Sequence, residues 1–348
     1  MIWIIVTITI LVLIYIITLF IQLNLYTFQS RADEIHYVST QDGWNLAIHR
    51  FLAEGDPKKQ FPVVLFPSLS LSAKSFDGGG FTPSLMKTLA ENGFDAWAVD
   101  IRGVGLSKPA TETTKRSWSF EDILCKDVPS VIDYIRKFVG TNKVHWVGHS
   151  MGGHLLIARL AEGRKDIASG IIAGSGFVPG QGGIDYTNNF RKIKFRRNVP
   201  LRSLARFSLP IAWLIKETVI MKRNAGRDGL KTILADVHSF PVELMKYALD
   251  VFQSGGFRNK GGSLYIENVD KIDTPLMFIV GDKDSYWTPN SVSKDVEKLG
   301  NVKTKTVFPG KQYGCQEHYG HGDILLGKNA EQEVYPEIMK WLEAYDKH

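Results

Sequence analysis

The stretch Lys143-Val-His-Trp-Val-Gly148-His-Ser150-Met-Gly152-Gly-His-Leu decides the fold of this chain. A short apolar run ends at Gly148, and a helical pattern of apolar residues begins directly after Gly152. Ser150 is therefore expected at a sharp turn between a strand and a helix. The two glycines permit a tight backbone, and the first turn of the helix leaves free N–H groups and a positive dipole end beside the serine. This arrangement suits a nucleophile that carries an anionic intermediate, although an ordinary glycine-rich turn is the alternative.

The first 21 residues, MIWIIVTITILVLIYIITLFI, have no charged side chain and only three threonines as polar residues. A helix of this length covers about 31 Å, close to the hydrocarbon thickness of a bilayer of roughly 30 Å. A cleaved signal peptide is the alternative, but the run lacks a basic start and a small-x-small cleavage site. We expect residues 1–27 to be a single-pass transmembrane anchor. The side of the membrane stays open, because the flanks offer only the α-amino group and Arg31.

Over the whole chain, 44% of the residues are hydrophobic and 22% are charged, which is ordinary for a globular protein. The chain contains no Asn-x-Ser/Thr sequence and only two cysteines, Cys125 and Cys315. Neither cysteine has a metal-binding spacing, so both are expected to be free and structural. Nothing in the sequence therefore indicates a glycosylated or disulfide-framed exterior, and no metal site is expected.

An antiparallel hairpin is predicted at 36–51, with Asp42-Gly43 as a two-residue turn. After it, buried strand-like runs alternate with helical stretches; the runs are 63–66, 94–100, 144–148, 167–173 and 276–280. This alternation predicts an α/β fold, with a mostly parallel sheet flanked by helices. Such sheets bind ligands beyond the carboxyl ends of their strands. The loops that follow these strands, including the one with Ser150, should therefore converge on one site.

Four motifs resemble those of the α/β-hydrolase fold family, in that family's order: Asp100-Ile-Arg-Gly-Val-Gly105, Gly148-His-Ser150-Met-Gly152, Gly281-Asp-Lys-Asp284 and Gly320-His321-Gly-Asp323. The resemblance runs from about residue 35 to the C-terminus and is similar to lipase-like and esterase-like serine hydrolases. It implies that Ser150 is the nucleophile, His321 the general base and an aspartate in the loop after the strand at 276–280 the third member of a triad. The chemistry agrees, because a serine needs an imidazole to take its proton and the imidazole needs a carboxylate to orient it.

Two aspartates compete for the acid position. Asp282 directly follows Gly281, whereas Asp284 lies farther into the loop. The family's spacing from the second aspartate to a helix-starting proline, here Pro289, favours Asp284. Asp282 is then expected to be a hydrogen-bonding residue of the loop.

Other histidines lie near the predicted site. His321 is preferred over His318 as the base because glycines flank it and permit a tight loop. His149 and His154 border the turn at the serine and are expected to pack rather than catalyse. Asp323 is expected to cap the stretch that follows it and is assigned no chemistry.

The predicted oxyanion hole departs from the family's pattern. Many members have His-Gly after the third strand, where this chain has Pro67-Ser68. Backbone donors survive side-chain changes, so the N–H groups of Leu69 and Met151 are the candidates. Proline lacks an N–H group and restricts its neighbour, which leaves the geometry of this loop open.

The glycine-rich stretch after Asp100 lacks the third glycine of a dinucleotide loop, so no cofactor is expected.

After Ser175 the alternation stops, and four prolines indicate several short helices. We expect a helical cap at 177–268, inserted between core segments 28–176 and 269–348. From 178 to 231, twelve basic residues stand against three acidic ones, a balance of +9 in a chain of net charge +6. The basic residues are Arg191, Lys192, Lys194, Arg196, Arg197, Arg202, Arg206, Lys216, Lys222, Arg223, Arg227 and Lys231.

Apolar runs at 209–215 and 219–221 interleave with this charge. The mixture is typical of a segment that lies on an anionic membrane, and a solvated basic face over an ordinary cap core is the alternative. Nucleic-acid binding is disfavoured, because no recognition motif accompanies the charge.

The sequence as a whole predicts a membrane-anchored serine hydrolase of carboxylic esters, with lipid-like acyl esters as substrates. An acyltransferase, a thioesterase or a non-catalytic binding protein on the same fold are the alternatives. Epoxide hydrolases and dehalogenases of this family use an aspartate at the turn, so Ser150 disfavours both chemistries.

Overall fold

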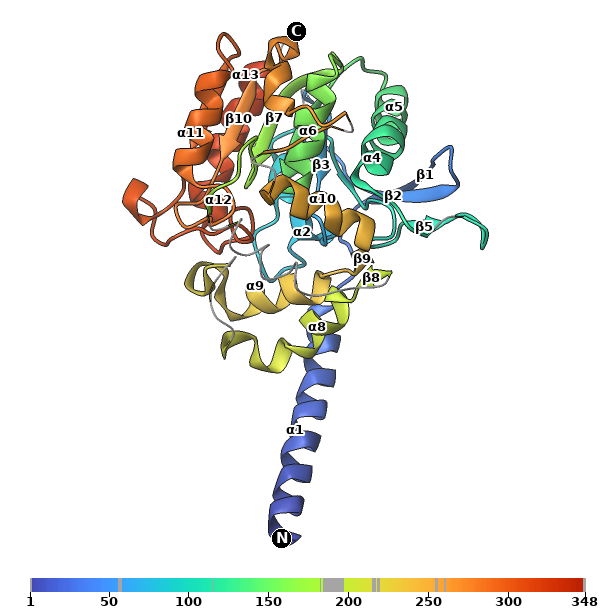
Figure 1. The fold of residues 1–348 in the computed structure, drawn as a ribbon, viewed down its shortest axis with the longest axis vertical. Helices are drawn as coiled ribbons and strands as arrows, with labels where there is room; N and C mark the ends of the chain where they lie inside the picture. The colour runs from blue at the N-terminus through green and yellow to red at the C-terminus, as the bar shows by residue number, and fades with distance from the viewer. Residues whose placement is uncertain are drawn as a thin grey trace.

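The predicted strands form one large sheet at the centre of the protein (Figure 1). This computed structural model describes residues 2–346 except 56–57, 115, 182, 184–196, 215–216, 218–219, 254–255 and 260. Within these residues the sheet has nine strands in the order β1-β2-β4-β3-β6-β7-β10-β11, with β5 paired to β2. The strands are β1 Glu34–Ser39, β2 Trp44–Phe51, β3 Val63–Phe66, β4 Ala96–Val99, β5 Lys108–Pro109, β6 Val144–His149, β7 Ile167–Ala173, β10 Leu276–Ile279 and β11 Thr304–Val307.

The sheet is mostly parallel, as the sequence predicts. The pairings from β4 through β3, β6, β7 and β10 to β11 are parallel, whereas β1, β2 and β5 pair antiparallel. Both β3 and β7 have the predicted bounds. The strand β11 was not expected, because its Thr and Lys residues lie on a partly exposed edge and do not form an apolar run.

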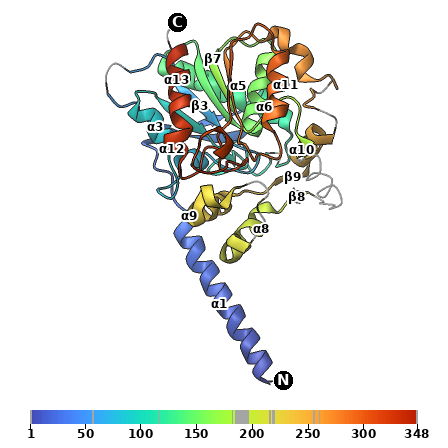
Figure 2. The same ribbon diagram turned by 90° about the vertical axis from the view of Figure 1, so that its left-hand side faces the viewer.

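Helices cover both faces of the sheet (Figure 2). Helices α3 and α13 pack on one face, and α5, α6 and α11 pack on the other. In β3 the side chains alternate between these two cores, so every residue of the strand is buried. The helices of the core are α2 Lys74–Asp77, α3 Leu85–Glu91, α4 Phe120–Asp122, η1 Ile123–Asp127, α5 Val128–Val139, α6 Met151–Ala161, α11 Pro289–Lys298, η4 Lys311–Tyr313, α12 Ala330–Glu333 and α13 Tyr335–Tyr345.

The first hairpin is antiparallel, but the predicted two-residue turn at Asp42-Gly43 is wrong. Ser39 is the last paired residue of β1, and the turn closes through a hydrogen bond of 3.1 Å from Gly43 N to Thr40 O. The wider turn places the Asp42 carboxylate where it accepts a hydrogen bond of 2.8 Å from Arg102.

The N-terminal apolar run forms one helix, α1 Ile2–Tyr26, which projects from the body and ends at the free N-terminus (Figures 1 and 2). The helix is long and apolar enough to cross a membrane, although a signal sequence has the same properties. Its most apolar window is not buried by the rest of the protein, whereas Tyr26 at its other end is buried.

Most of the described chain between β7 and β10 lies at the carboxyl ends of the parallel strands, between the sheet and α1 (Figure 1), but its last helix packs against α6 and α11. Its elements are β8 Asn198–Val199, α8 Leu201–Phe207, η2 Leu209–Leu214, α9 Lys222–Asp236, β9 Phe240–Pro241, α10 Val242–Gln253 and η3 Tyr265–Lys271. The two short strands pair antiparallel with each other. Of the basic residues in the predicted cap, Arg191, Lys192, Lys194, Arg196 and Lys216 lie outside the described residues.

Candidate active site

The turn after β6 holds Ser150 in a strained backbone conformation. Ser150 has φ 53° and ψ −112°, and it is the one non-glycine residue with positive φ in the described part of the chain. A Cβ on Gly148 would lie 2.3 Å from the backbone of Gly152, and one on Gly152 would lie 2.1 Å from Phe66 O. Only glycine fits at these two positions, because the turn, α6 and β3 approach one another so closely. The predicted strand, turn and helix are therefore confirmed.

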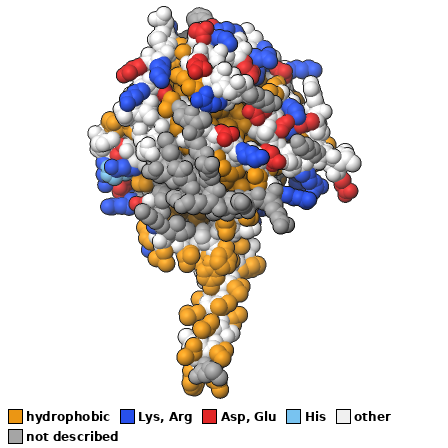
Figure 3. All heavy atoms as spheres, viewed as in Figure 1, with side chains coloured by type: hydrophobic (Ala, Val, Ile, Leu, Met, Phe, Trp, Pro, Cys, Tyr) orange, Lys and Arg blue, Asp and Glu red, His pale blue; other side chains and the backbone are white. Residues whose placement is uncertain are grey.

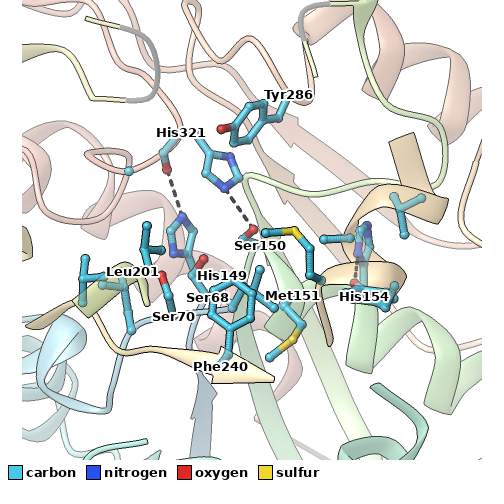
Figure 4. A pocket seen from close by; sticks show the side chains of 18 of the residues that line it. Ser68, Ser70, His149, Ser150, Met151, His154, Leu201, Phe240, Tyr286 and His321 are labelled. Carbon is cyan, nitrogen blue, oxygen red and sulfur yellow. Dashed lines mark hydrogen bonds between the residues drawn. The ribbon is translucent and has the colours of Figure 1, made fainter. Parts of the chain in front are cut away.

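Ser150, His321 and Asp284 form a hydrogen-bonded chain. The Ser150 Oγ lies 2.9 Å from His321 Nε2 (Figure 4), and His321 Nδ1 lies 3.0 Å from Asp284 Oδ2. A carboxylate only accepts hydrogen bonds, so Nδ1 carries the proton and Nε2 is free to accept from the serine hydroxyl. The fold thus brings together three residues that are 37 and 171 positions apart.

The loop after β10 fixes the Asp284 carboxylate. Its Oδ1 accepts hydrogen bonds from the backbone N–H groups of Tyr286 at 2.8 Å and Trp287 at 3.1 Å. The same two side chains pack against the ring of His321, with centroid distances of 4.9 and 6.0 Å. Because the histidine is held on both sides, its ring has little freedom to turn away from the serine. His321 is only 5% exposed.

The other acid and base candidates pair with each other. His318 Nδ1 lies 2.5 Å from Asp282 Oδ2, and the Asp282 carboxylate also accepts from Tyr319 N at 3.0 Å. Neither residue belongs to the hydrogen-bonded chain of Ser150, His321 and Asp284. Asp282 is thus a hydrogen-bonding residue of its loop, as the sequence predicts.

The two histidines that border Ser150 do more than pack. His149 Nε2 donates to the backbone O of His321 at 2.9 Å, so it helps to hold the loop of His321 in place (Figure 4). His154 Nε2 donates to Gly176 O at 3.0 Å, and its Nδ1 accepts from the Tyr247 hydroxyl of α10. Burial lowers the pKa of His149 to about 4, with the neighbouring His321 as a second cause, and lowers the pKa of His154 to about 3. Both rings therefore stay neutral near pH 7.

The two predicted oxyanion donors line one cavity beside Ser150. The N–H of Met151 is the first of α6 and has no acceptor within the helix. Leu69 lies in the loop after β3, and its N–H donates no hydrogen bond to another described atom. Both groups are consequently available to a ligand oxygen.

The loop that carries Leu69 is held by α9. The Asp236 carboxylate accepts from Ser72 N at 2.9 Å and from Ser72 Oγ at 2.6 Å, and Ser70 O accepts from His238 N at 2.7 Å. This role of Asp236 could not be recognised from the sequence, because nothing in the local pattern links the residue to a loop more than 160 residues earlier. In this chain, which lacks the family's His-Gly, Asp236 supplies the contacts that position the loop.

We predict that Asp236→Ala lowers kcat for a soluble ester by about 10- to 100-fold, because the loss of one oxyanion donor typically costs about 100- to 1000-fold. The KM should change less, since Asp236 itself does not line the cavity. Ser72→Ala keeps the backbone donor to Asp236 and should have a smaller effect. Steady-state kinetics with thermal unfolding as a fold control test the prediction, and an unchanged kcat in a folded Asp236→Ala protein would contradict it.

Asp323 links the loop of His321 to α9. It was expected to cap the following stretch, but its side chain accepts from Met221 N at 2.9 Å, Asn224 Nδ2 at 2.7 Å and Gly320 N at 3.2 Å. The expectation is wrong because the carboxylate faces the cap, where these donors lie. Burial raises the pKa of Asp323 from 3.8 to about 7. The residue thus joins the loop of His321 to the helix that also holds the loop of Leu69.

The raised pKa of Asp323 predicts a stability that depends on pH. The folded state binds the proton more tightly than the unfolded chain, so stability falls as pH rises from about 4 to about 7, by about 4 kcal/mol for a shift of this size. Asp323→Asn should flatten this part of the profile. Asn224 Oδ1 is buried without a partner in the described structure and can accept from the new amide after an amide flip. Thermal unfolding of both proteins from pH 4 to pH 8 tests this, and parallel profiles would contradict it.

A cavity of about 350 Å³ opens at Ser150. Its walls are mainly apolar and come from the loop after β3 and from the elements between β7 and β10; they include Leu71, Leu201, Ile233, Phe240, Met245 and Phe252. Among the polar lining residues, Ser68, Ser70 and His149 lie near Ser150 and His321 (Figure 4). This arrangement of polar and apolar side chains suits a ligand with one polar reacting group and an apolar remainder.

No group of three or more His, Cys, Asp or Glu side chains in the described residues is arranged to hold a metal ion.

Known proteins resemble the chain in sequence. Residues 77–218 match the family model described as serine aminopeptidase, S33. Lipase 1 of Drosophila melanogaster is 25% identical over 346 residues, which cover 89% of this chain and 76% of that protein. Human lipase member K is 23% identical over 90% of this chain and 88% of its own length.

Solved structures share the fold. A thermophilic esterase from Thermogutta terrifontis has a TM-score of 0.62 at 15% identity and covers 90% of this chain and 100% of its own. A soluble variant of monoglyceride lipase from Saccharomyces cerevisiae has a TM-score of 0.61 at 16% identity, over 92% and 98% of the two chains. Together with the sheet order and the turn at Ser150, these findings identify the chain as a lipase-like and esterase-like enzyme with the α/β-hydrolase fold.

Proposed function

We propose that the protein is a membrane-anchored serine hydrolase that cleaves carboxylic esters of lipid-like acyl chains. Ser150 is the nucleophile, His321 the general base and Asp284 the acid that orients the base. The observation that carries the proposal is the hydrogen-bonded chain of these three residues at the polar end of an apolar cavity. The names of the lipase relatives support an ester of a lipid as substrate.

The proposed reaction begins when the Ser150 Oγ attacks the ester carbonyl carbon and its proton passes to His321 Nε2. The carbonyl oxygen becomes negative, and the N–H groups of Leu69 and Met151 stabilise it. As the intermediate collapses, His321 returns the proton to the leaving alcohol and an acyl-enzyme remains. Water then gives a proton to His321 and attacks the acyl carbon. A second collapse releases the carboxylic acid and restores the Ser150 hydroxyl with the proton from His321.

We further propose that the chain divides into an anchor at 1–27, a catalytic core at 28–176 and 269–348, and a cap at 177–268. Most of the elements between β7 and β10 support this division, because they lie over the carboxyl ends of the strands and supply most of the cavity wall. The apolar, projecting α1 supports the anchor. The side of the membrane on which the enzyme lies stays open.

An activity profile tests the proposed function. The full-length chain in membranes is treated with a fluorophosphonate probe and then assayed with p-nitrophenyl esters of increasing acyl length. Covalent labelling and turnover that rises with chain length are the expected results. A thioester and an added alcohol as acyl acceptor distinguish ester hydrolysis from thioester hydrolysis and acyl transfer. A folded protein with no labelling and no turnover of any ester would contradict the proposal.

A further inference from the structure

The anchor helix lies against the cap along almost half of its length. Near its C-terminal end the Tyr26 hydroxyl donates to Asp228 of α9 at 2.5 Å. Much nearer the N-terminus, the Tyr15 hydroxyl donates to the backbone O of Phe207, and the two rings lie 5.2 Å apart. Residues 15–26 therefore run beside α8, η2 and α9, over about 17 Å at 1.5 Å per residue.

The length of α1 that extends beyond the cap is too short to cross a bilayer. Residues 2–14 cover about 20 Å, whereas the hydrocarbon layer is roughly 30 Å thick. The missing length is close to that of residues 15–21, which complete the apolar run before the polar Gln22 and Asn24. If α1 spans the membrane, the segment around Tyr15 must lie in the hydrocarbon layer. Whatever packs against Tyr15 must lie there too, and that partner is Phe207.

The part of the cap beside this segment is apolar and exposed. We call this surface the cap tip; it consists of Leu204, Phe207, Ile211 and Leu214. Leu214 is 81% exposed and Phe207 62% exposed. Apolar side chains on the lower body and on α1 form a continuous region (Figure 3). Exposed apolar groups gathered in this way mark a surface that is covered by a partner or a membrane.

Aromatic and basic side chains border the cap tip. Lys222 Nζ and the Arg227 guanidinium lie over the Trp213 ring, at 5.9 and 5.4 Å from its centroid. Lys231 Nζ lies 5.3 Å from the centre of the Tyr26 ring in the same way. Trp and Tyr favour the headgroup level of a bilayer, and Lys and Arg favour its anionic lipids. This border indicates where the membrane surface crosses the protein.

We infer that the cap tip, which α8 and η2 carry, is embedded in the acyl region of the leaflet from which α1 emerges, an inference that rests on the proposed anchor. The cap is then part of the membrane-inserted protein and does not merely face the lipid headgroups. Leu201 of α8 and Ile233 and Leu234 of α9 line the cavity from within the same cap. The substrate class is therefore a lipid ester that resides in the membrane, and its acyl chain moves from the leaflet to Ser150 through this cap.

A fluorescent label tests the depth of the cap tip in the full-length protein. Leu214→Cys is made in a Cys125→Ser and Cys315→Ser background, labelled with an NBD fluorophore and placed in phosphatidylcholine and phosphatidylglycerol vesicles that contain doxyl-labelled lipid. Leu52→Cys is the matched control: Leu52 is 39% exposed and follows Phe51, which pairs with the first residue of β4, at the end of the sheet opposite the cap. Ile10→Cys reports on the middle of α1.

The expected result is blue-shifted emission and strong quenching by doxyl lipid at positions 10 and 214, and neither effect at position 52. Quenching at 10 with a water-like signal at 214 would overturn the inference and leave the anchor intact. A water-like signal at 10 would overturn the anchor, and with it the inference.

Turnover provides a second readout. Phe207→Asn with Leu214→Asn should lower hydrolysis of a lipid ester in vesicles by about tenfold or more, because two polar groups are placed in the acyl region. Hydrolysis of a soluble short ester should not change, since neither side chain lines the cavity. Leu52→Asn should affect neither activity. Equal turnover of the vesicle lipid by the double variant and by Leu52→Asn would overturn the inference.

Discussion

Ser150→Ala is expected to abolish ester hydrolysis and labelling by a fluorophosphonate, with a loss in kcat on the order of 10⁴- to 10⁶-fold. Without the hydroxyl there is no atom to attack the carbonyl, and the remaining oxyanion donors and cavity give only weak catalysis. The fold should persist, because the substitution removes one hydrogen bond, to His321, worth about 1 kcal/mol. Alanine is also no more strained than serine at this positive φ. Probe labelling, initial rates and the Tm of the purified protein are the measurements.

Ser39→Ala is a suitable control for this prediction, since Ser39 is an exposed serine at the end of β1 and bonds only to Asn45 among the side chains described. It should keep full labelling and turnover. Labelling that persists in Ser150→Ala would mean that another serine is the nucleophile, and Ser68 and Ser70 also line the cavity. Residual turnover near one-tenth of the starting rate would argue against Ser150 in the same way.

The features that the sequence predicts well are those encoded by neighbouring residues. The apolar runs predict the central strands because burial on both faces of a parallel sheet requires apolar side chains throughout. The glycines around Ser150 predict the strained turn because any larger residue would collide with the backbone. The family's spacing also selected Asp284 over Asp282, and the structure places Asp284 against His321.

The features that the sequence misses depend on contacts between distant segments. Asp236 holds the loop that carries Leu69, Asp323 joins the loop of His321 to α9, and His149 bonds to the backbone of His321. Each is a single polar residue whose partner is set by the tertiary fold, so no periodicity or local spacing reveals it. The hairpin turn shows the same effect on a smaller scale, because Asp42 in the turn contacts Arg102, which lies 60 positions away in the chain.

Asp284→Asn is expected to lower kcat by about 10⁴-fold while the structure of the loop persists. The amide oxygen can still accept from the backbone N–H groups of Tyr286 and Trp287. The amide NH₂, however, faces His321 Nδ1, where two donors would oppose each other. The histidine then shifts its proton to Nε2, which can no longer take the proton of Ser150. The wrong tautomer, and not a change of position, is the cause of the loss.

Asp282→Asn is the matched comparison, because it makes the same chemical change two residues away. Asp282 bonds to His318 and to the backbone of Tyr319, outside the chain of proton transfer, so its replacement should lower kcat less than tenfold. Rates with a soluble ester and the Tm of both variants separate catalysis from folding. A larger loss in Asp282→Asn than in Asp284→Asn would reassign the acid of the triad. Comparable small losses in both would mean that neither carboxylate sets the tautomer of His321.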